Sequence, residues 1–327
     1  MKRREFVKIL GGTAVTWPFA AQAQQAEKLR RVGALLPYSE SDPRIAFYNA
    51  FKQRLRELGW IEGRNIQIVS RFTGGKVELI RRGADELVAA APEVIFGNTN
   101  AGAAALKQAT QSIPVVFAGV ANPVGSGIVA DLARPPGNLT GFQSLENAIG
   151  GKWVEVLREI APGLRRVAFV YNPNEPVNVA MLSAAESAAA ALGVALIPIP
   201  VRQAAEIEPA LTAFAQADSG FIVAPQSVTT DSSELLIKLA ERLRLPAIYS
   251  IDYIARQGGL VTYGTDILEL YRSAAGYIDR ILRGAKPGDL PVQLPVKYMM
   301  IVNLKTARDL GITVPPALVT RADEVIE

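Results

Sequence analysis

The sequence predicts an α/β protein made of two similar lobes, each a largely parallel sheet covered by helices. Three observations carry this prediction. Short continuous apolar runs, typical of buried parallel strands, alternate with segments whose apolar residues recur at helical spacing. Five short motifs recur in the same order, each 121 to 135 residues further along the chain, as expected for an internal repeat. The length of 327 residues also fits two domains of roughly 150 residues each.

The first unit opens with an apolar strand over residues 32–36, which Pro37 ends. A helix is expected from Pro43 to Gly59, because the apolar residues between them recur every three or four positions. This alternation of strand and helix is typical of a parallel sheet with helical connections. Further strands are expected at 66–72, 94–96 and 115–117, with helices at 77–90 and 101–111.

The second unit repeats the first. Arg30-Arg31-Val32, which heads the first strand, returns as Arg165-Arg166-Val167 at the head of an apolar strand over 167–170. Any one such match is weak, but five in order at nearly one offset predict two lobes of the same topology. The other four pairs are residues 58–59 with 192–193, 93–96 with 220–223, 113–116 with 245–248, and 137–141 with 258–262.

An extra helix and an extra strand follow the second unit. The helix has an apolar face from Leu268 to Leu282 and ends before Gly284 and Pro287. The tail over 297–327 adds a strand-like run, a short helix and a Pro-Pro turn. Two lobes need such extra elements if the chain crosses back between them. The expected first lobe therefore comprises residues 24–141 and about 264–290, and the second comprises 142–263 and about 291–327.

Residues 1–23 have the form of an export signal. A basic start from Lys2 to Lys8 precedes an apolar run that is shorter than the ~20 residues of a membrane span. The small residues around Gln22 predict cleavage after Ala23. Arg3-Arg4 resembles the twin-arginine signal, although the general secretory route and an uncleaved cytoplasmic N-terminus stay open. We expect a free periplasmic protein, because no cysteine follows the signal to accept a lipid.

The composition excludes several classes of site. The chain has no histidine and no cysteine, which excludes disulfides, thiol nucleophiles, Ser-His-Asp triads and histidine metal sites. Residues 1–23 hold four of the 35 basic and one of the 31 acidic residues, so the remainder is nearly neutral and gives no reason to expect nucleic acid as a partner. Gly125-Ser126-Gly127 begins a G-x-G-x-x-A match, but its position fits a packed loop better than a dinucleotide site. We expect no cofactor, no metal and no catalytic residues, and therefore a protein that is not an enzyme.

Polar and aromatic side chains stand where strands end in both units. Ligands of open α/β sheets bind at the carboxyl ends of the strands, and amides, hydroxyls and aromatic rings suit a small polar molecule. The same residues could instead only cap helices and form turns, and for any single residue both interpretations stay open. Recurrence in both units favours a cleft shared between the lobes. The clusters are Tyr38-Ser39, Asn98-Thr99-Asn100, Asn122, Tyr171-Asn172, Gln226-Ser227 and Tyr249-Ser250.

Longer motifs carry a resemblance to a known family over essentially the whole chain. They are the twin-arginine start, Trp17-Pro18, residues 58–65 (LGWIEGRN), Asn122-Pro123-Val124, residues 137–142 (GNLTGF), Gly151-Lys152-Trp153 and residues 302–307 (VNLKTA). With these motifs the chain resembles the ABC-transporter substrate-binding proteins related to tryptophan/tyrosine-type periplasmic binding proteins. The resemblance implies a type I periplasmic-binding fold, in which two Rossmann-like lobes with parallel sheets are joined by crossover strands and close on a ligand. It also implies delivery of a small molecule to an ABC permease in the inner membrane, and we expect the protein to be a monomer.

The resemblance also implies ligand contacts by position. One of them departs from the family pattern, because many relatives carry an Asp where this chain has Gln226, and a carboxylate there suits a ligand's ammonium group. Glu175 or Asp252 could supply the carboxylate instead, so an amino-acid-like ligand stays open. An exported enzyme using the same cleft and a ligand sensor for a signalling receptor stay open as alternative functions. The implied contacts are Tyr38, Asn98, Thr99, Asn122, Tyr171, Asn172, Gln226 and Tyr249.

Overall fold

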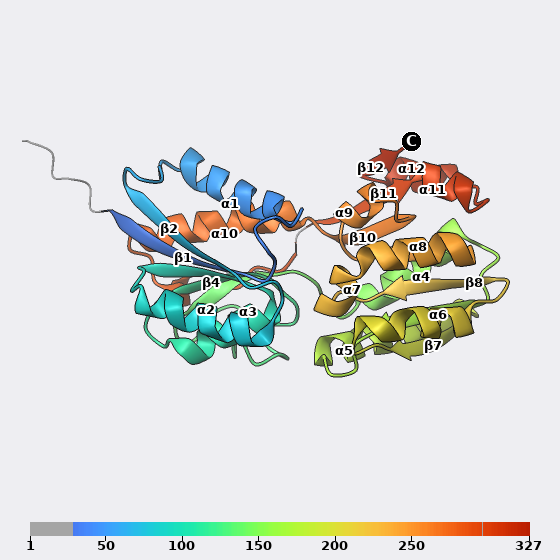
Figure 1. Cartoon of the computed structure of the whole chain (residues 1–327), viewed down its shortest axis with the longest axis horizontal. Coiled ribbons are helices and arrows are strands. Elements are labelled where there is room, and N and C mark those ends of the chain that lie inside the picture. Colours follow the sequence, from blue (N-terminus) through green and yellow to red (C-terminus); the bar gives the residue numbers. More distant parts are fainter. Residues whose placement is uncertain (1–28, 296) are drawn as a thin grey trace, which may run out of the picture.

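The protein consists of two lobes that lie side by side, each built on one sheet (Figure 1). This computed structural model describes residues 29–295 and 297–327. The expected export signal and its cleavage site after Ala23 lie outside the described residues. The expected fold class is confirmed, since both sheets are mostly parallel and helices cover their faces.

The first lobe holds a five-stranded parallel sheet in the order β2-β1-β3-β4-β5. Side chains alternate along its strands, so that Val32 and Ala34 face one core and Leu35 faces the other. Helices α1 and α10 cover the first face, and α2 and α3 cover the second. The elements are β1 (Arg30–Leu36), α1 (Ile45–Glu57), β2 (Ile66–Phe72), α2 (Val77–Ala89), β3 (Val94–Asn98), α3 (Thr99–Ala109), β4 (Val115–Val120), β5 (Leu139–Gln143), α10 (Ile267–Leu282) and the 3-10 helix η2 (Pro287–Asp289).

The second lobe holds a seven-stranded sheet in the order β12-β11-β10-β9-β8-β6-β7. Among the described strands of this sheet, only β10 and β11 pair antiparallel. Helices α4 and α5 pack on one face around the buried Trp153, and α6 and α8 pack on the other. The elements are α4 (Ile149–Ile160), β6 (Arg166–Tyr171), α5 (Pro176–Ala191), β7 (Ala195–Pro200), η1 (Ala204–Glu206), α6 (Ile207–Phe214), β8 (Ser219–Val223), α7 (Ser227–Asp231), α8 (Ser233–Leu243), β9 (Ala247–Tyr249), α9 (Tyr253–Arg256), β10 (Val261–Thr265), β11 (Tyr298–Asn303), α11 (Leu304–Asp309), α12 (Pro316–Arg321) and β12 (Glu324–Ile326).

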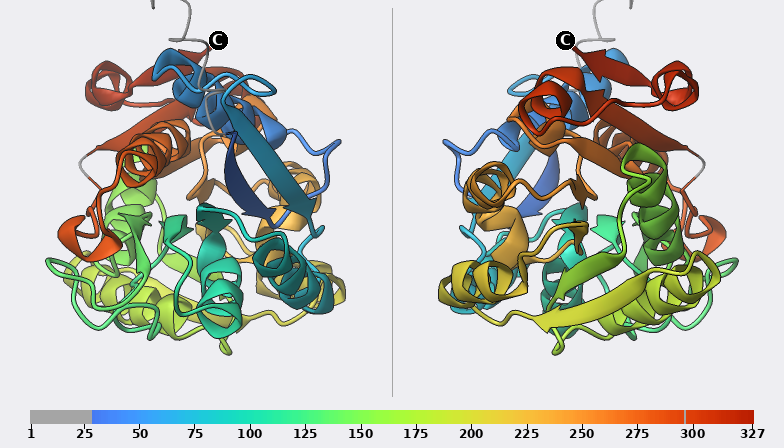
Figure 2. Two further views of the ribbon diagram at one scale, coloured as in Figure 1. Left: turned by 90° about the vertical axis from the view of Figure 1, so that its left-hand side faces the viewer. Right: turned by 90° about the vertical axis from the view of Figure 1, so that its right-hand side faces the viewer.

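The internal repeat corresponds to one topology used twice. The order β2-β1-β3-β4-β5 in the first sheet is matched by β7-β6-β8-β9-β10 in the second. The repeated motifs fall on equivalent elements: the Arg-Arg-Val pair heads β1 and β6, and the Leu-Gly pair ends α1 and α5. The second sheet is larger because β11 and β12 add to its edge. Figure 2 shows the C-terminus at this edge, beside β12.

The chain passes between the lobes after β5, after β10 and before β11. These segments are tied together, because Gln293 and Gly141 join by a 2.9 Å backbone hydrogen bond and the Thr265 hydroxyl donates to the Ser144 carbonyl oxygen. Helix α10 returns to the first lobe and lies beside α1 (Figure 1). The lobe bounds expected from the sequence stay a prediction, and we name each lobe here by its sheet.

Two boundaries differ from the expected ones in a way that matters for the site. Strand β3 runs to Asn98 instead of residue 96, and α3 begins at Thr99 instead of residue 101. The strand therefore passes into the helix with no loop between them. Asn98 and Thr99 are therefore held in place by strand β3 on one side and helix α3 on the other. Within the described part of the chain, no helix has the length and apolarity needed to cross a membrane.

Candidate functional site

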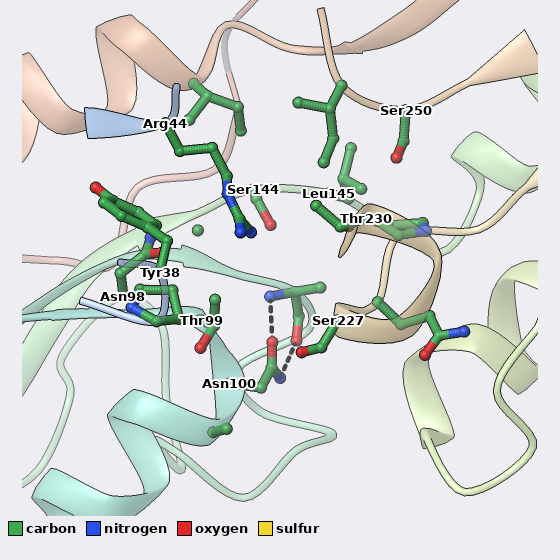
Figure 3. A pocket seen from close by; sticks show the side chains of 18 of the residues that line it. Tyr38, Arg44, Asn98, Thr99, Asn100, Ser144, Leu145, Ser227, Thr230 and Ser250 are labelled. Carbon is green, nitrogen blue, oxygen red and sulfur yellow. Dashed lines mark hydrogen bonds between the residues drawn. The ribbon is translucent and has the colours of Figure 1, made fainter. Parts of the chain in front are cut away.

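The candidate site is a cleft between the two lobes, at the carboxyl ends of both sheets. Its empty volume is about 1210 Å³, open solvent at its mouth included. Figure 3 shows Tyr38, Asn98 and Thr99 on one side of the cavity and Thr230 and Ser250 on the other. This position follows from topology, because parallel strands bring all their carboxyl ends to one edge of the sheet.

The first-lobe wall is made by the end of β3 and the start of α3. The Asn98 side chain donates from Nδ2 to the carbonyl oxygen of Ala118 at 2.8 Å, which fixes its amide against β4. Gly119, near the end of β4, leaves room for the Asn98 amide. A Cβ at this position would lie 2.7 Å from Asn98 Nδ2. Asn100 holds the loop after β4 by bonding both the N–H and the carbonyl oxygen of Ala121 (Figure 3).

Thr99 has a backbone conformation that is unusual for its side chain. Its φ is +66°, in the left-handed region that β-branched residues rarely adopt. The Thr99 hydroxyl accepts a hydrogen bond from the Gly102 N–H at 3.4 Å, and the residue lines the cleft. Backbone strain of this kind is concentrated at binding and catalytic sites.

The second-lobe wall offers a carboxylate and a carboxamide whose side chains have no partner among the described residues. Glu175 is an exposed residue at the start of α5, and partial desolvation on the cleft wall raises the pKa of its carboxyl above the ordinary value. Among the described residues no basic side chain forms an ion pair with it. Gln226, just before α7, has both Nε2 and Oε1 buried with no hydrogen-bond partner in the described structure.

Aromatic and aliphatic side chains form much of the remaining lining. Tyr38 is only 2% exposed, and its hydroxyl lies 3.3 Å from the Tyr271 hydroxyl. Burial raises the pKa of Tyr38, so the phenol stays neutral. Phe47, Tyr253 and Ile251 add further apolar surface. Such a lining can hold the hydrocarbon part of a small molecule.

An ion pair joins the lobes at the cleft. The Arg44 guanidinium contacts Asp42 of its own lobe through two hydrogen bonds of 2.9 and 2.7 Å. It also donates to Asp231 of the second lobe at 2.9 Å. Burial alone would lower the pKa of Arg44, but the hydrogen bond and charge of Asp42 and the charge of Asp231 raise it overall. The guanidinium also lies 5.3 Å from the centre of the Tyr38 ring and points into the cavity in Figure 3.

The charges that line the cleft leave negative charge in excess. They are Arg44, Glu175 and Asp231, and Arg44 is already paired with two carboxylates. Nowhere in residues 29–295 and 297–327 do three or more acidic side chains gather as metal ligands. The cleft therefore favours a ligand with a positive group over a purely anionic one.

Four of the eight contacts expected from the sequence line the cleft, namely Tyr38, Asn98, Thr99 and Gln226. The other four do not line it. Asn122 and Asn172 each accept a 3.0 Å hydrogen bond from a backbone N–H two or three residues later, so both side chains form turns. Tyr171 packs against the core under α4 and α5, and Tyr249 is 1% exposed in the core under α6 and α8.

The structure separates the two carboxylates considered as replacements for an Asp at position 226. Glu175 lines the cleft. Asp252 does not, and its Oδ2 accepts from Arg256 at 2.7 Å. Arg44 and Asp231 were missed because they lie at the ends of short loops and helices, where no periodic pattern marks them.

Comparisons with known proteins agree with this architecture. The family described as ABC transporter substrate binding protein matches residues 34–326. The chain belongs to this family. A solved conserved domain protein from Vibrio cholerae is 27% identical to this substrate-binding protein, has a TM-score of 0.84, and covers 91% of this chain and 100% of its own. The fold is the type I periplasmic-binding fold.

Two further relatives have names or titles that state a ligand. A tyrosine-binding protein from Clostridioides difficile is 22% identical over 260 residues, which is 80% of this chain and 75% of that protein. The structure of an ABC domain in complex with L-Trp from Streptococcus pneumonia is 24% identical, with a TM-score of 0.84, over 91% of this chain and 100% of that one. The function of the present chain is accordingly substrate binding for an ABC transporter.

Proposed function

We propose that this protein binds a small solute with a protonated amine, of the amino-acid kind, and delivers it to an ABC permease in the inner membrane. The observation that carries the proposal is Glu175, a partly desolvated carboxylate on the cleft wall that forms no ion pair within the described chain. The tyrosine-binding relative and the L-Trp complex support an amino-acid-like solute.

Each part of such a solute has a counterpart in the cleft. An ammonium group beside Glu175 would favour the charged carboxylate and offset the effect of burial on its pKa. A carboxylate would suit the start of α3 at Thr99 and Asn100, because the first backbone N–H groups of a helix carry partial positive charge. The side chain would lie against Tyr38 and Phe47.

Contacts from both walls explain how binding drives closure. A ligand that touches both Asn98 in the first lobe and Gln226 in the second interacts more strongly with the closed form than with the open one. Tyr38 and Thr99 complete the set of expected contacts that we retain. The Arg44–Asp231 pair adds a contact that exists only while the lobes lie together.

We also propose that export removes residues 1–23 and that the mature chain acts in the periplasm as a monomer. It would release its solute unchanged, since the proposed roles of the cleft residues are hydrogen bonding, charge pairing and packing. N-terminal sequencing of periplasmic protein tests the first part. Material that begins at Met1 would contradict it.

Calorimetric titration of the mature protein tests the ligand class. L-tyrosine and L-tryptophan are compared with their N-acetyl derivatives, which lack the positive charge. We expect Glu175→Gln to weaken binding of the free amino acids by about tenfold or more, as expected when a charged hydrogen bond is lost. The matched control is Asp252→Asn, which removes a carboxylate outside the cleft and should leave affinity unchanged.

Two outcomes would contradict the proposal. Equal affinity for amines and N-acetyl compounds would show that Glu175 does not receive a cation. A change in the mass of the bound compound during incubation, followed by native mass spectrometry, would favour the exported enzyme instead.

A further inference from the structure

We propose that Gln226 makes this protein selective for solutes that carry a hydrogen-bond donor and an acceptor side by side, as a carboxamide or a lactam does. The proposal deepens the proposed function and rests on it, since it assumes that the cleft holds the solute. It assigns the amine and the amide of one solute to two different side chains on the same wall.

The backbone around Gln226 is fixed by the fold. The residue is extended, with φ −163° and ψ 164°, and directly precedes α7. Its carbonyl oxygen accepts from the Thr230 N–H at 2.9 Å and from the Thr229 hydroxyl at 3.2 Å. The carbonyl oxygen of Pro225 accepts from Asn178 Nδ2 at 3.1 Å. These bonds hold the position from which the side chain lines the cleft.

The Gln226 side chain takes no part in that scaffold. It does not cap α7, although it stands at the capping position. Its Nε2 and Oε1 are both buried and have no partner in the described structure. Buried amide atoms without partners are unfavourable and are rare in native proteins. Of the described side chains with such orphaned atoms, Gln226 is the one that lines the cleft.

The chemistry of the missing partner follows from the two atoms. An ammonium group has only donors and would pair with Oε1 alone, while a carboxylate has only acceptors and would pair with Nε2 alone. A carboxamide or lactam offers one of each and pairs with both. Exchanging the nitrogen and oxygen of Gln226 does not alter this conclusion, because both atoms are unpaired.

The neighbouring Glu175 makes the assignment consistent. It lines the same wall and has the charge that an ammonium group needs. An ammonium placed at Gln226 would leave Glu175 and one Gln226 atom unpaired, whereas an amine at Glu175 and an amide at Gln226 would satisfy all of these groups. The expected solute class is therefore an amine that also carries a carboxamide, lactam or ureide.

The test uses the mature protein, Gln226→Met and Gln226→Glu, with matched probes. The probes are L-glutamine, L-asparagine and L-citrulline, with L-glutamate, L-aspartate and L-norleucine as partners that lack the amide. We expect the wild type to bind at least one amide probe about tenfold or more tighter than its partner, because a site built for hydrogen bonds rejects analogues that lack them. Gln226→Met should abolish this preference, and Gln226→Glu should weaken binding of the amide.

A second readout needs no solute. Gln226→Met replaces two orphaned atoms with an apolar side chain of similar size, so the empty variant should melt at a higher temperature than the wild type. A lower melting temperature with an unchanged far-ultraviolet spectrum would show that the amide is satisfied in the empty protein, and it would overturn the proposal.

The binding results separate this proposal from the proposed function. If Gln226→Met keeps the wild-type ranking of the probes while Glu175→Gln loses affinity for amines, the amide selectivity is wrong and the amine-binding cleft stands. If no probe binds, the solute that co-purifies is identified by native mass spectrometry and fragmentation. A co-purified amine without a carboxamide, lactam or ureide would likewise overturn the selectivity, whereas one that contains such a group would support it.

Discussion

Replacing Asp231 by Asn removes one charge from the ion pair that joins the lobes and changes little else. Asn keeps the size of the side chain and an oxygen that can accept from Arg44. The Arg44 guanidinium remains bonded to Asp42 in its own lobe. The change therefore acts on the contact between the lobes, and we expect the closed form to become less populated.

The magnitude follows from the geometry of the pair. At a nitrogen–oxygen distance of 2.9 Å, the charges attract by about 6 kcal/mol if the effective dielectric constant is ~20. The Asp231 side chain is 47% exposed, and exposed pairs contribute only ~0.2–1 kcal/mol. Arg44 is 19% exposed and already ordered by Asp42, so the upper end applies. A loss of ~1 kcal/mol corresponds to about a fivefold drop in the closed-to-open ratio.

Single-molecule fluorescence transfer can measure this ratio. The chain has no cysteine, so Ser41→Cys and Lys238→Cys would carry two dyes, one on each lobe, without background labelling. Closure of the wild type should weaken as salt rises, because salt screens the pair. Closure of the Asp231→Asn variant should be lower and less sensitive to salt.

A matched control separates the lobe contact from general charge effects. Glu208→Gln breaks an exposed pair with Arg242 that lies wholly within the second lobe, and it should leave closure unchanged. If Asp231→Asn closes as often as the wild type at every salt concentration, the Arg44–Asp231 pair does not stabilise the closed form.

Three further predictions concern stability and binding. Gly150→Ala should lower the free energy of unfolding by ~2–4 kcal/mol, because the new Cβ would lie 2.0 Å from the Met181 carbonyl oxygen. The control is Gly276→Ala, where the new Cβ meets open space. Urea titrations should show that this control raises the free energy of unfolding by ~0.5–1 kcal/mol. Burial raises the pKa of Glu175, so the folded state favours the neutral carboxyl. The protonated Glu175 side chain therefore contributes most to the free energy of unfolding below the unfolded-state pKa of about 4.3. This contribution is lost as pH rises through the folded-state pKa. Urea titrations across this window should show the loss in wild type and not in Glu175→Gln, and equal profiles would contradict it. Asn98→Ala removes a buried hydrogen bond to β4, so it should lower the free energy of unfolding by ~1–3 kcal/mol. The same variant should also bind the ligand more weakly. A variant that keeps both its stability and its ligand affinity would exclude Asn98 from the site.

The sequence alone predicts the sheets well because their strands are buried on both faces. The run at Val32 is continuously apolar, and parallel strands between helices require that. Strand β7 is harder to predict, since it lies at the sheet edge, is half-exposed and contains Pro198 and Pro200. An edge strand does not require a continuous apolar run, and it tolerates proline because not every backbone N–H has to donate to a neighbouring strand.

The repeat also explains which expected contacts fall in the cleft. At its local offsets, Thr99 of the first unit corresponds to Gln226 of the second, and both line the cleft. Tyr171 corresponds to Leu36 and Tyr249 to Phe117, and both partners are fully buried core residues. Comparing the two units residue by residue would therefore have placed both tyrosines in the core.

The contact between the lobes could not be predicted in this way. Arg44 precedes α1 and Asp231 ends α7, and the two are 187 positions apart in the chain. Their meeting depends on how the lobes close, which no local pattern encodes. Loop residues that act together across a cleft have no periodicity of their own.

A crystal structure of the mature protein with its co-purified solute would show directly whether the cleft holds an amine between the two lobes. We expect one solute between the lobes, in contact with Asn98 on one wall and Gln226 on the other, with its amine within hydrogen-bond distance of the Glu175 carboxylate. A solute bound to a single lobe, or one whose positive group lies away from Glu175, would contradict it.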